Sequence, residues 1–444
     1  MKKADVLIVG GSAAGLVAGI TARRHYPDAS ITLIRREKQV LIPCAIPYLF
    51  GTIGSTSKNL ISDAVLSQNG IDLIIDEVTS IDREAKTLTT KGGETIGYEK
   101  LILGTGSLPI ILPLPGVDLD NVFVAKKDVQ YLDNMLETMG QVKDVVVIGG
   151  GFIGLEFADE FRKKGLNVTV VELLPHCLFL VFDEEICTRA EEELDKLGIK
   201  VMTNSKAKAI LGNGKAERVQ LDSGEELKAD AVLIGVGVRP NTDLAQKAGL
   251  KIGERRGIWV DRYMRTSDEN IFAAGDCAEK TDFFTGKPSA LRLASIAAAE
   301  ARIAGANLFT LKRENKGAVG VFSTKIGDLY MGMAGMREKT AREAGFDIAV
   351  GTVETVDKHP GSMPGATSLR VKLVFHRDSG RLLGGQACGG VSVGELANVI
   401  AALIQGGMTA DQVATFQMGT HPALTASPIV YPLANAAEIA LKEM

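Results

Sequence analysis

Cys44 is the residue of this chain best suited to chemistry. It stands in the run Cys44-x-x-Pro47-Tyr48, shortly after a glycine-rich stretch, residues 5–15, that is typical of a strand, a tight turn and a helix. Turns of this kind bind the phosphates of a nucleotide cofactor. A thiol near a helix N-terminus is held as the reactive thiolate. Together these features indicate redox chemistry at sulfur.

The first glycine-rich turn predicts a βαβ dinucleotide site, with a strand over residues 6–9, a helix to about Tyr26 and a second strand over residues 30–34. Ser12 stands where a second glycine is expected, and Arg35 stands where an acid normally meets the ribose. Glu37 or a backbone group replaces that acid, or Arg35 packs over the adenine or contacts phosphate. The candidate cofactor contacts are Gly10, Gly11, Ser12, Ala13, Ala14, Gly15, Arg35, Arg36 and Cys44 itself.

A second unit repeats the pattern, with a strand over residues 144–148, a helix to about Lys164 and a strand over residues 167–172. Its three glycines serve the tight turn, the close approach of the pyrophosphate and the packing of helix on strand. Glu172 is placed to accept from a ribose 2′-hydroxyl and would repel a 2′-phosphate, so NADH is expected in preference to NADPH. The candidate contacts are Gly149, Gly151, Phe152, Ile153, Gly154 and Glu172.

Further strand-to-turn segments, residues 101–107 and 270–276, favour a flavin site. Asp276 ends a strand and could accept from a ribityl hydroxyl or its water, the alternative being a helix cap. We also assign to the cofactor sites Val78, Thr105, Gly106, Gly237, Leu293 and Ala294.

Composition narrows the class of protein. A chain of 444 residues with 45% hydrophobic residues is long enough for two or three domains. A net charge of -4 argues against nucleic-acid binding. The first residues leave no room for a signal peptide and no segment suits a membrane span, so we expect a cytoplasmic protein without membrane contact. The cysteines form neither a C-x-x-C pair nor a metal cluster, which indicates reduced thiols, no metal, and a structural role for all but Cys44.

These residues resemble the two-dinucleotide flavoproteins, the pyridine nucleotide-disulfide oxidoreductases. The markers are the two glycine-rich units and residues 104–106, 237–241 and 275–276. Cys44 without a C-x4-C pair is similar to the single-cysteine branch, which comprises coenzyme A disulfide reductases, NADH oxidases and peroxidases, and persulfide or polysulfide reductases. The resemblance implies FAD in the first unit, NAD(P)H in the second, and a homodimer.

The implied fold class is α/β, with two Rossmann-like dinucleotide-binding domains and a C-terminal α+β dimerisation domain. We expect the FAD domain over residues 1–115 and 243–318, the NAD(P)H domain over residues 116–242, and the dimerisation domain over residues 319–444. Within the last, residues 369–375 alternate like a half-buried strand and residues 396–404 suit a helix.

The implied reaction passes electrons from NADH through the flavin to Cys44 and then to a disulfide, persulfide or polysulfide. Cys44 is expected to precede a helix that begins near Pro47. His421 is the candidate proton donor, with an ordinary surface histidine as the alternative. Coenzyme A disulfide reductases carry tyrosines in the His421 segment and near Met363, so these departures weaken that particular assignment.

Two other functions remain open. In an NADH oxidase or peroxidase, Cys44 would cycle as a sulfenic acid with oxygen or peroxide. In a flavoprotein reductase of a small redox protein, Cys44 would be incidental.

Overall fold

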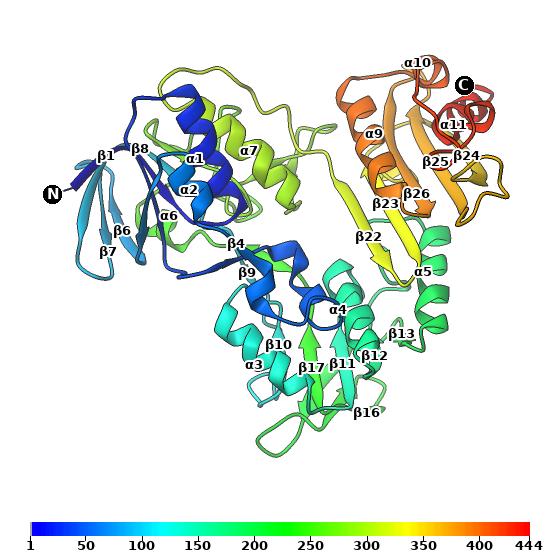
Figure 1. Cartoon of the computed structure of the whole chain (residues 1–444), viewed down its shortest axis with the longest axis horizontal. Coiled ribbons are helices and arrows are strands. Elements are labelled where there is room, and N and C mark those ends of the chain that lie inside the picture. The colour runs from blue at the N-terminus through cyan, green and yellow to red at the C-terminus, as the bar shows by residue number, and fades with distance from the viewer. Residues whose placement is uncertain (1) are drawn as a thin grey trace. The chain divides into compact units, whose positions relative to one another are not determined.

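The computed structural model describes residues 2–444, which form two compact units. Unit 1 comprises Met1–Ile111, Val124–Gln141 and Gly237–Ala318, and unit 2 comprises Leu112–Phe123, Val142–Val236 and Val319–Met444. Both units are thus assembled from stretches that lie far apart in the sequence (Figure 1).

Unit 1 is built on a sheet whose central strands are parallel and buried. Its strands are β1 (Lys2–Val9), β2 (Ile31–Arg35), β5 (Asp72–Ile75), β6 (Val78–Asp82), β7 (Thr87–Thr90), β8 (Thr95–Leu103) and β19 (Ile271–Ala273). The order is β5-β2-β1-β8-β7-β6, and β19 pairs with the C-terminal part of β8. Runs of Val, Leu and Ile suit β1, β2 and β8 because helices and loops cover parallel sheets on both faces.

Two helices of unit 1 pack closely because small residues lie at their contact. The helices of the unit are α1 (Ala13–His25), α2 (Ala64–Gln68), α3 (Val129–Met139), α6 (Asp243–Lys247) and α7 (Ala294–Ala306). A Cβ atom on Gly305 of α7 would lie 2.6 Å from the carbonyl oxygen of Ala18 of α1, so the two backbones nearly touch (Figure 1). Short strand pairs complete the unit, namely β9 (Ser107–Pro109) with β18 (Val238–Pro240) and β20 (Lys280–Thr281) with β21 (Pro288–Ser289).

A segment that leaves the sheet after β2 carries Cys44. Strands β3 (Val40–Leu41) and β4 (Leu60–Ile61) pair with each other, and residues 42–59 between them form what we term the Cys44 segment. It contains three 3-10 helices, Pro43–Ala45, Pro47–Leu49 and Thr56–Asn59. Cys44 therefore lies inside a short 3-10 turn, and the α-helix expected from Pro47 onward is absent there. The nitrogen of Pro47 cannot donate, so the turn Pro43–Ala45 cannot continue through it.

The first part of unit 2 is a second parallel sheet of nucleotide-binding type. Its order is β10 (Val122–Val124), β17 (Ala231–Ile234), β11 (Asp144–Ile148), β12 (Asn167–Val171) and β13 (Lys200–Met202). An antiparallel sheet holds β14 (Ala207–Leu211), β15 (Arg218–Leu221) and β16 (Glu226–Lys228), and the helices are α4 (Phe152–Lys163) and α5 (Glu184–Lys196). The order places β11 and its glycine turn in the middle of the sheet.

The second part of unit 2 is an antiparallel sheet of order β22 (Val321–Ile326), β23 (Leu329–Gly335), β26 (Leu382–Gly389), β25 (Ser368–His376) and β24 (Ile348–Val356). Its helices are α8 (Glu338–Glu343), α9 (Val393–Gln405), α10 (Ala410–Ala414) and α11 (Pro432–Leu441). Helix α9 packs on β22, β23 and β26, and α11 packs on β24 and β25 (Figure 1).

Strand β25 corrects the expectation of a half-buried strand. Both of its faces are buried along most of its length. The polar Lys372, which made the sequence alternate, is itself buried because carboxylates of other elements surround it.

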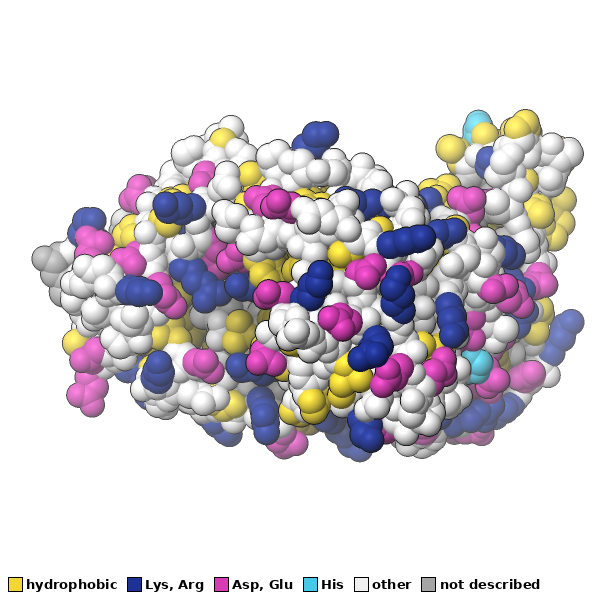
Figure 2. Space-filling model, turned by 90° about the horizontal axis from the view of Figure 1, so that it is seen from below, with side chains coloured by type: hydrophobic (Ala, Val, Ile, Leu, Met, Phe, Trp, Pro, Cys, Tyr) yellow, Lys and Arg dark blue, Asp and Glu magenta, His cyan; other side chains and the backbone are white. Residues whose placement is uncertain are grey.

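The face shown in Figure 2 carries charges of both signs. On the side shown in Figure 2, Lys and Arg side chains are interspersed with Asp and Glu. Among the described residues, no helix combines the length and the apolar character needed to cross a membrane.

Candidate active site

The first glycine turn has no room for side chains. Gly10 ends β1 with φ of 112°, and a Cβ atom there would lie 2.1 Å from the carbonyl oxygen of Gly104. A Cβ atom on Gly15 would lie 1.8 Å from the carbonyl oxygen of Gly10. The turn therefore brings the start of α1 against the end of β1, as a phosphate-binding turn requires.

Two helices of unit 1 begin without side-chain caps. Ser12 precedes α1 and Leu293 precedes α7, and neither side chain makes a capping hydrogen bond. Neither helix has an acid in its first turn. The first N–H groups of both helices, at Ala13, Ala14 and Ala294, can therefore donate to an anion such as a phosphate.

A cavity of about 330 Å³ in unit 1 brings together predicted residues from distant parts of the sequence. Its lining includes Gly10, Arg35, Arg36, Val78 and Thr105. The volume falls at the lower end of the range of roughly 300–1,000 Å³ found for ligand sites. The tight turn, the free helix starts and this cavity fit a dinucleotide cofactor such as FAD.

The guanidinium of Arg35 is occupied by the protein itself. It forms a bidentate ion pair with Asp63, at 2.7 and 2.8 Å, and donates to the carbonyl oxygens of Glu37 and Lys38. These bonds use four of its five N–H donors. The Arg35 side chain is only 1% exposed. It therefore has little free surface and one unused donor with which to make the phosphate or adenine contact considered from the sequence. Glu37, which also lines the cavity, accepts from Arg36 at one carboxylate oxygen and keeps the other as an acceptor.

Asp276 follows β19 and is held by its neighbours. Ser107 donates to its carboxylate at 2.8 Å, and the Lys127 ammonium lies 3.9 Å away. Thr105 donates its hydroxyl to the carbonyl oxygen of Asn241, which joins the predicted turn at residues 104–106 to the segment after β18.

Glu300 and Lys280 support this strand end and were missed by the sequence reasoning. Glu300 accepts from the backbone N–H of Gly275 at 2.9 Å and pairs with Lys280 at 2.8 Å, with both side chains only 2% exposed. Lys280 also donates to the carbonyl oxygen of Gly275. Burial raises the pKa of Glu300, and Lys280 opposes that shift. The feature of the sequence that could have indicated this role is Glu300 itself, a single acid in an alanine-rich helix.

Cys44 is exposed, whereas the other four cysteines of the chain are buried. Burial raises the pKa of Cys187 to about 12 and that of Cys388 to about 11. The pKa values of Cys177 and Cys277 are raised for the same reason. These four thiols stay protonated at neutral pH, which leaves Cys44 as the thiol accessible to a substrate.

The second glycine turn, in unit 2, repeats the first. Gly149 has φ of 110°, and a Cβ atom on Gly154 would lie 1.9 Å from the carbonyl oxygen of Gly149. No described atom lies within 4 Å of a Cβ built on Gly151, so space is open on that side of the backbone. Helix α4 begins at Phe152 and Ile153 with no side-chain cap and no acid in its first turn. The site fits the pyrophosphate of NAD(P)H.

Glu172 faces this turn. Its carboxylate accepts from the N–H of Gly150 at 2.6 Å and from the N–H of Leu174 at 2.7 Å. Each oxygen keeps a further lone pair for a ribose hydroxyl. Gly150 was not singled out from the sequence, yet a Cβ atom there would lie 2.6 Å from the Cys177 sulfur and 3.0 Å from Glu172.

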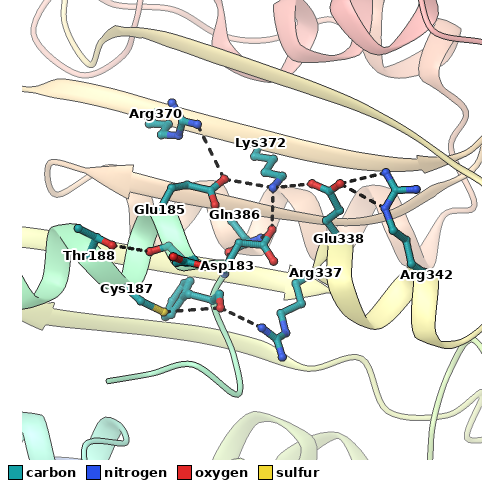
Figure 3. Close-up of polar contacts among 12 residues, drawn as sticks. Asp183, Glu185, Cys187, Thr188, Arg337, Glu338, Arg342, Arg370, Lys372 and Gln386 are labelled. Carbon is teal, nitrogen blue, oxygen red and sulfur yellow. Dashed lines mark hydrogen bonds and ion pairs between the residues drawn. The ribbon is translucent and has the colours of Figure 1, made fainter. Parts of the chain in front are cut away.

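The chain after Glu172 is anchored to the C-terminal sheet by a buried charge cluster (Figure 3). Lys372 of β25 contacts Asp183 and Glu338 at 2.8 Å and Glu185 at 3.1 Å. Gln386 of β26 donates its amide to the Asp183 carboxylate and accepts from the Asp183 N–H. Burial alone would lower the pKa of Lys372, but the carboxylates outweigh it and raise that pKa overall. We term these five residues the Lys372 cluster.

Glu156 is a further titratable group near the second turn. It lies in α4, one turn after the helix begins, and accepts from the Thr324 hydroxyl at 3.0 Å. Burial raises the pKa of Glu156 to about 7, with a contribution from Glu160 and opposition from the Thr324 hydrogen bond. The group can therefore exchange a proton at neutral pH.

Two predicted residues remain, Gly237 and His421. Gly237, with φ of 102°, begins the stretch that returns the chain to unit 1. His421 belongs to unit 2, is exposed, and accepts at Nδ1 from the N–H of Ala423. Cys44 and His421 thus belong to different units of one chain.

Comparison with known proteins identifies the class. Residues 4–301 match the pyridine nucleotide-disulphide oxidoreductase family, and residues 321–428 match the dimerisation domain of that family. With the two nucleotide-binding turns, these matches define an oxidoreductase that uses a pyridine nucleotide. The chain belongs to the pyridine nucleotide-disulphide oxidoreductase family.

Similar proteins include an NADH oxidase from Methanocaldococcus jannaschii, 34% identical over 450 residues with 99% of each chain covered. A CoA-dependent NAD(P)H sulfur oxidoreductase from Pyrococcus furiosus is 33% identical over 446 residues, again with 99% of each covered. The solved NAD-dependent persulfide reductase from A. fulgidus has a TM-score of 0.92 at 32% identity, covering 99% of this chain and 83% of that chain. The predicted family, fold class and enzyme class are confirmed.

Proposed function

We propose that this protein is an FAD-dependent NADH oxidoreductase that reduces a disulfide, persulfide or polysulfide through Cys44. The observation that carries the proposal is that Cys44, on the segment that follows β2 of a flavin-type dinucleotide unit, is exposed, while every other thiol is buried. The names of the sulfur-reducing relatives support the acceptor class.

FAD would be held by the turn from Gly10 to Gly15, the starts of α1 and α7, the cavity and Asp276. NADH would be held by the turn from Gly149 to Gly154 and by Glu172. The bound flavin supplies electron transfer between nicotinamide and sulfur. The domain division is proposed as FAD domain 1–115 and 243–318, NADH domain 116–242 and dimerisation domain 319–444, and the match of residues 321–428 supports a homodimer.

Cys44 would act as the nucleophile. Its thiolate attacks a sulfur of the acceptor, forms a mixed disulfide and releases the other sulfur as a thiolate. His421 of the second chain in the proposed homodimer is the proposed proton donor to that leaving group. Its Nδ1 accepts a backbone hydrogen bond, which assigns the ring proton of the neutral form to Nε2.

An NADH oxidase is the second candidate, supported by the name of the relative from M. jannaschii. In that reaction Cys44 would be oxidised to a sulfenic acid by peroxide and then reduced again. Oxygen and sulfur acceptors can be told apart by supplying each alone.

The test is NADH consumption with polysulfide, with coenzyme A disulfide and with oxygen, each measured for wild type, Cys44→Ser and Cys388→Ala. We expect Cys44→Ser to lose sulfur reduction but to keep hydride uptake from NADH, and Cys388→Ala, which changes a buried thiol, to behave as wild type. Polysulfide reduction by Cys44→Ser at the wild-type rate would contradict the proposal and favour transfer to a small redox protein.

A further inference from the structure

Arg35 occupies the one position at which the first nucleotide unit departs most from its pattern, and its surroundings assign it another role. The two ends of the Cys44 segment, Ile42 and Asn59, are hydrogen-bonded to each other, and we term this pairing the neck. There the Ile42 N–H donates to the carbonyl oxygen of Asn59 at 2.9 Å, and the buried Asn59 side chain donates back to the carbonyl oxygen of Ile42 at 3.1 Å.

Arg35 holds the chain on both sides of this neck. On the entry side it donates to the carbonyl oxygens of Glu37 at 2.8 Å and Lys38 at 3.1 Å. On the exit side it binds both carboxylate oxygens of Asp63. Asp63 is the residue before α2, yet its side chain makes no capping hydrogen bond to that helix. It binds Arg35 instead.

The same side chain touches the phosphate-binding turn. A Cβ atom on Gly11 would lie 2.4 Å from Cδ of Arg35, so the arginine stem runs directly over the Gly11 backbone. One buried side chain therefore joins three parts of unit 1, which are the cofactor turn and the two stretches that flank the Cys44 segment, at residues 37–38 and at Asp63.

An acid at position 35 could not make these contacts. A glutamate has no donor for the two carbonyl oxygens, and it would repel Asp63. Arginine and Asp63 thus form a matched pair, since the planar guanidinium suits bidentate binding of a carboxylate. Further anchors of the segment include its buried Ile46 and Leu49 and the hydrogen bond from Thr56 to Asp133 at 2.6 Å.

We propose that Arg35 is a positioning residue: with Asp63 it clamps the Cys44 segment to the cofactor turn and so fixes where the Cys44 sulfur stands. It acts on the reaction through the segment and binds neither the ribose nor a phosphate. Its effect on turnover rests on the proposed function of Cys44, whereas its effect on the segment does not.

The test is amide hydrogen exchange of the flavin-loaded protein, with Asp63→Asn as the main variant because Asp63 lies away from Gly11. Exchange of residues 42–59 should accelerate about tenfold, as expected for the loss of a charge-assisted bidentate pair, while exchange in β1 and β8 stays unchanged. Asp63→Glu should restore slow exchange. Asp268→Asn is the matched control, because it breaks another arginine–aspartate pair of unit 1, that with Arg83.

Turnover gives the second readout. In Asp63→Asn, kcat for the sulfur acceptor should fall about tenfold, while the KM for NADH and the flavin content stay at wild-type values. Unchanged exchange of residues 42–59 in Asp63→Asn would overturn the clamp, whatever Cys44 does. Faster exchange combined with wild-type sulfur reduction by Cys44→Ser would uphold the clamp and reject the proposed function.

Discussion

Replacing Lys372 by methionine should destabilise unit 2 far more than an ordinary surface lysine does. Lys372 is 8% exposed and faces Asp183, which is equally buried, together with Glu185 and Glu338. Methionine fills a similar volume but removes the only cation within ion-pairing distance of Asp183 among the described residues. The negative charge of Glu185 would still be partly balanced by Arg370, and that of Glu338 by Arg342.

The loss of stability therefore comes mainly from the buried Asp183 carboxylate, which is left without a counter-charge. Removing one partner of a buried pair costs about 3–5 kcal/mol, and we take about 3 kcal/mol because Gln386 still donates to Asp183. For a unit of this size that loss lowers Tm by roughly 6–12 °C. Asp183→Asn placed in the same chain should recover most of the loss, since it removes the unpaired charge and keeps an oxygen for Gln386.

Calorimetry of Lys372→Met, the double variant and Lys228→Met would check this reasoning. Lys228 pairs with Asp144 at 2.7 Å but is 71% exposed, so its loss should change stability far less than the loss of Lys372. The cluster also anchors the chain that follows Glu172, so Lys372→Met should raise the KM for NADH. Equal stability of Lys372→Met and Lys228→Met would refute the argument.

Three further predictions concern single carboxylates. Glu172→Ala should reduce the preference for NADH over NADPH in kcat/KM, because the group that accepts from the ribose and repels a 2′-phosphate is gone; no shift in that ratio would count against the assigned role. Glu300→Gln should leave Lys280 buried without a counter-charge, which costs about 3 kcal/mol and should lower the FAD content of purified protein, measured after extraction. Glu156 has a folded-state pKa raised to about 7, above its ordinary value of 4.5, so its contribution to stability is lost as pH rises through that window. Glu156→Gln should flatten the fall in Tm between pH 5 and pH 8, and an unchanged slope would disprove the raised pKa.

The repeated elements could be predicted from the sequence because their causes are local. Gly10, Gly15, Gly149 and Gly154 occupy fixed places in a turn that tolerates no side chain, and strands of Val, Leu and Ile precede them. The helix expected to end near Lys164 ends at Lys163. The burial of Cys177, Cys187, Cys277 and Cys388 agrees with the structural role predicted for them.

Residues whose roles depend on distant partners could not be predicted in this way. Arg35 departs visibly from the sequence pattern, yet no residue close to it in the sequence indicates that Asp63 is its partner. From the sequence, Lys372 is expected on the solvent-facing side of a strand. Its partners Asp183 and Glu338 are remote in the sequence, so their contact with it could not be foreseen. Glu300 is one acid in an alanine-rich helix until the fold brings Lys280 and Gly275 to it. The prolines of the Cys44 segment were visible, but the preference for 3-10 turns over an α-helix there depends on how the segment packs.

The most direct test of the central claim is an anaerobic titration of the flavin-loaded protein with two electrons per flavin, followed by absorbance. A thiolate beside oxidised flavin gives a long-wavelength charge-transfer band, so the account predicts this band in wild type and in Cys388→Ala and its loss in Cys44→Ser. Identical spectra for wild type and Cys44→Ser would contradict the claim that Cys44 carries the electrons.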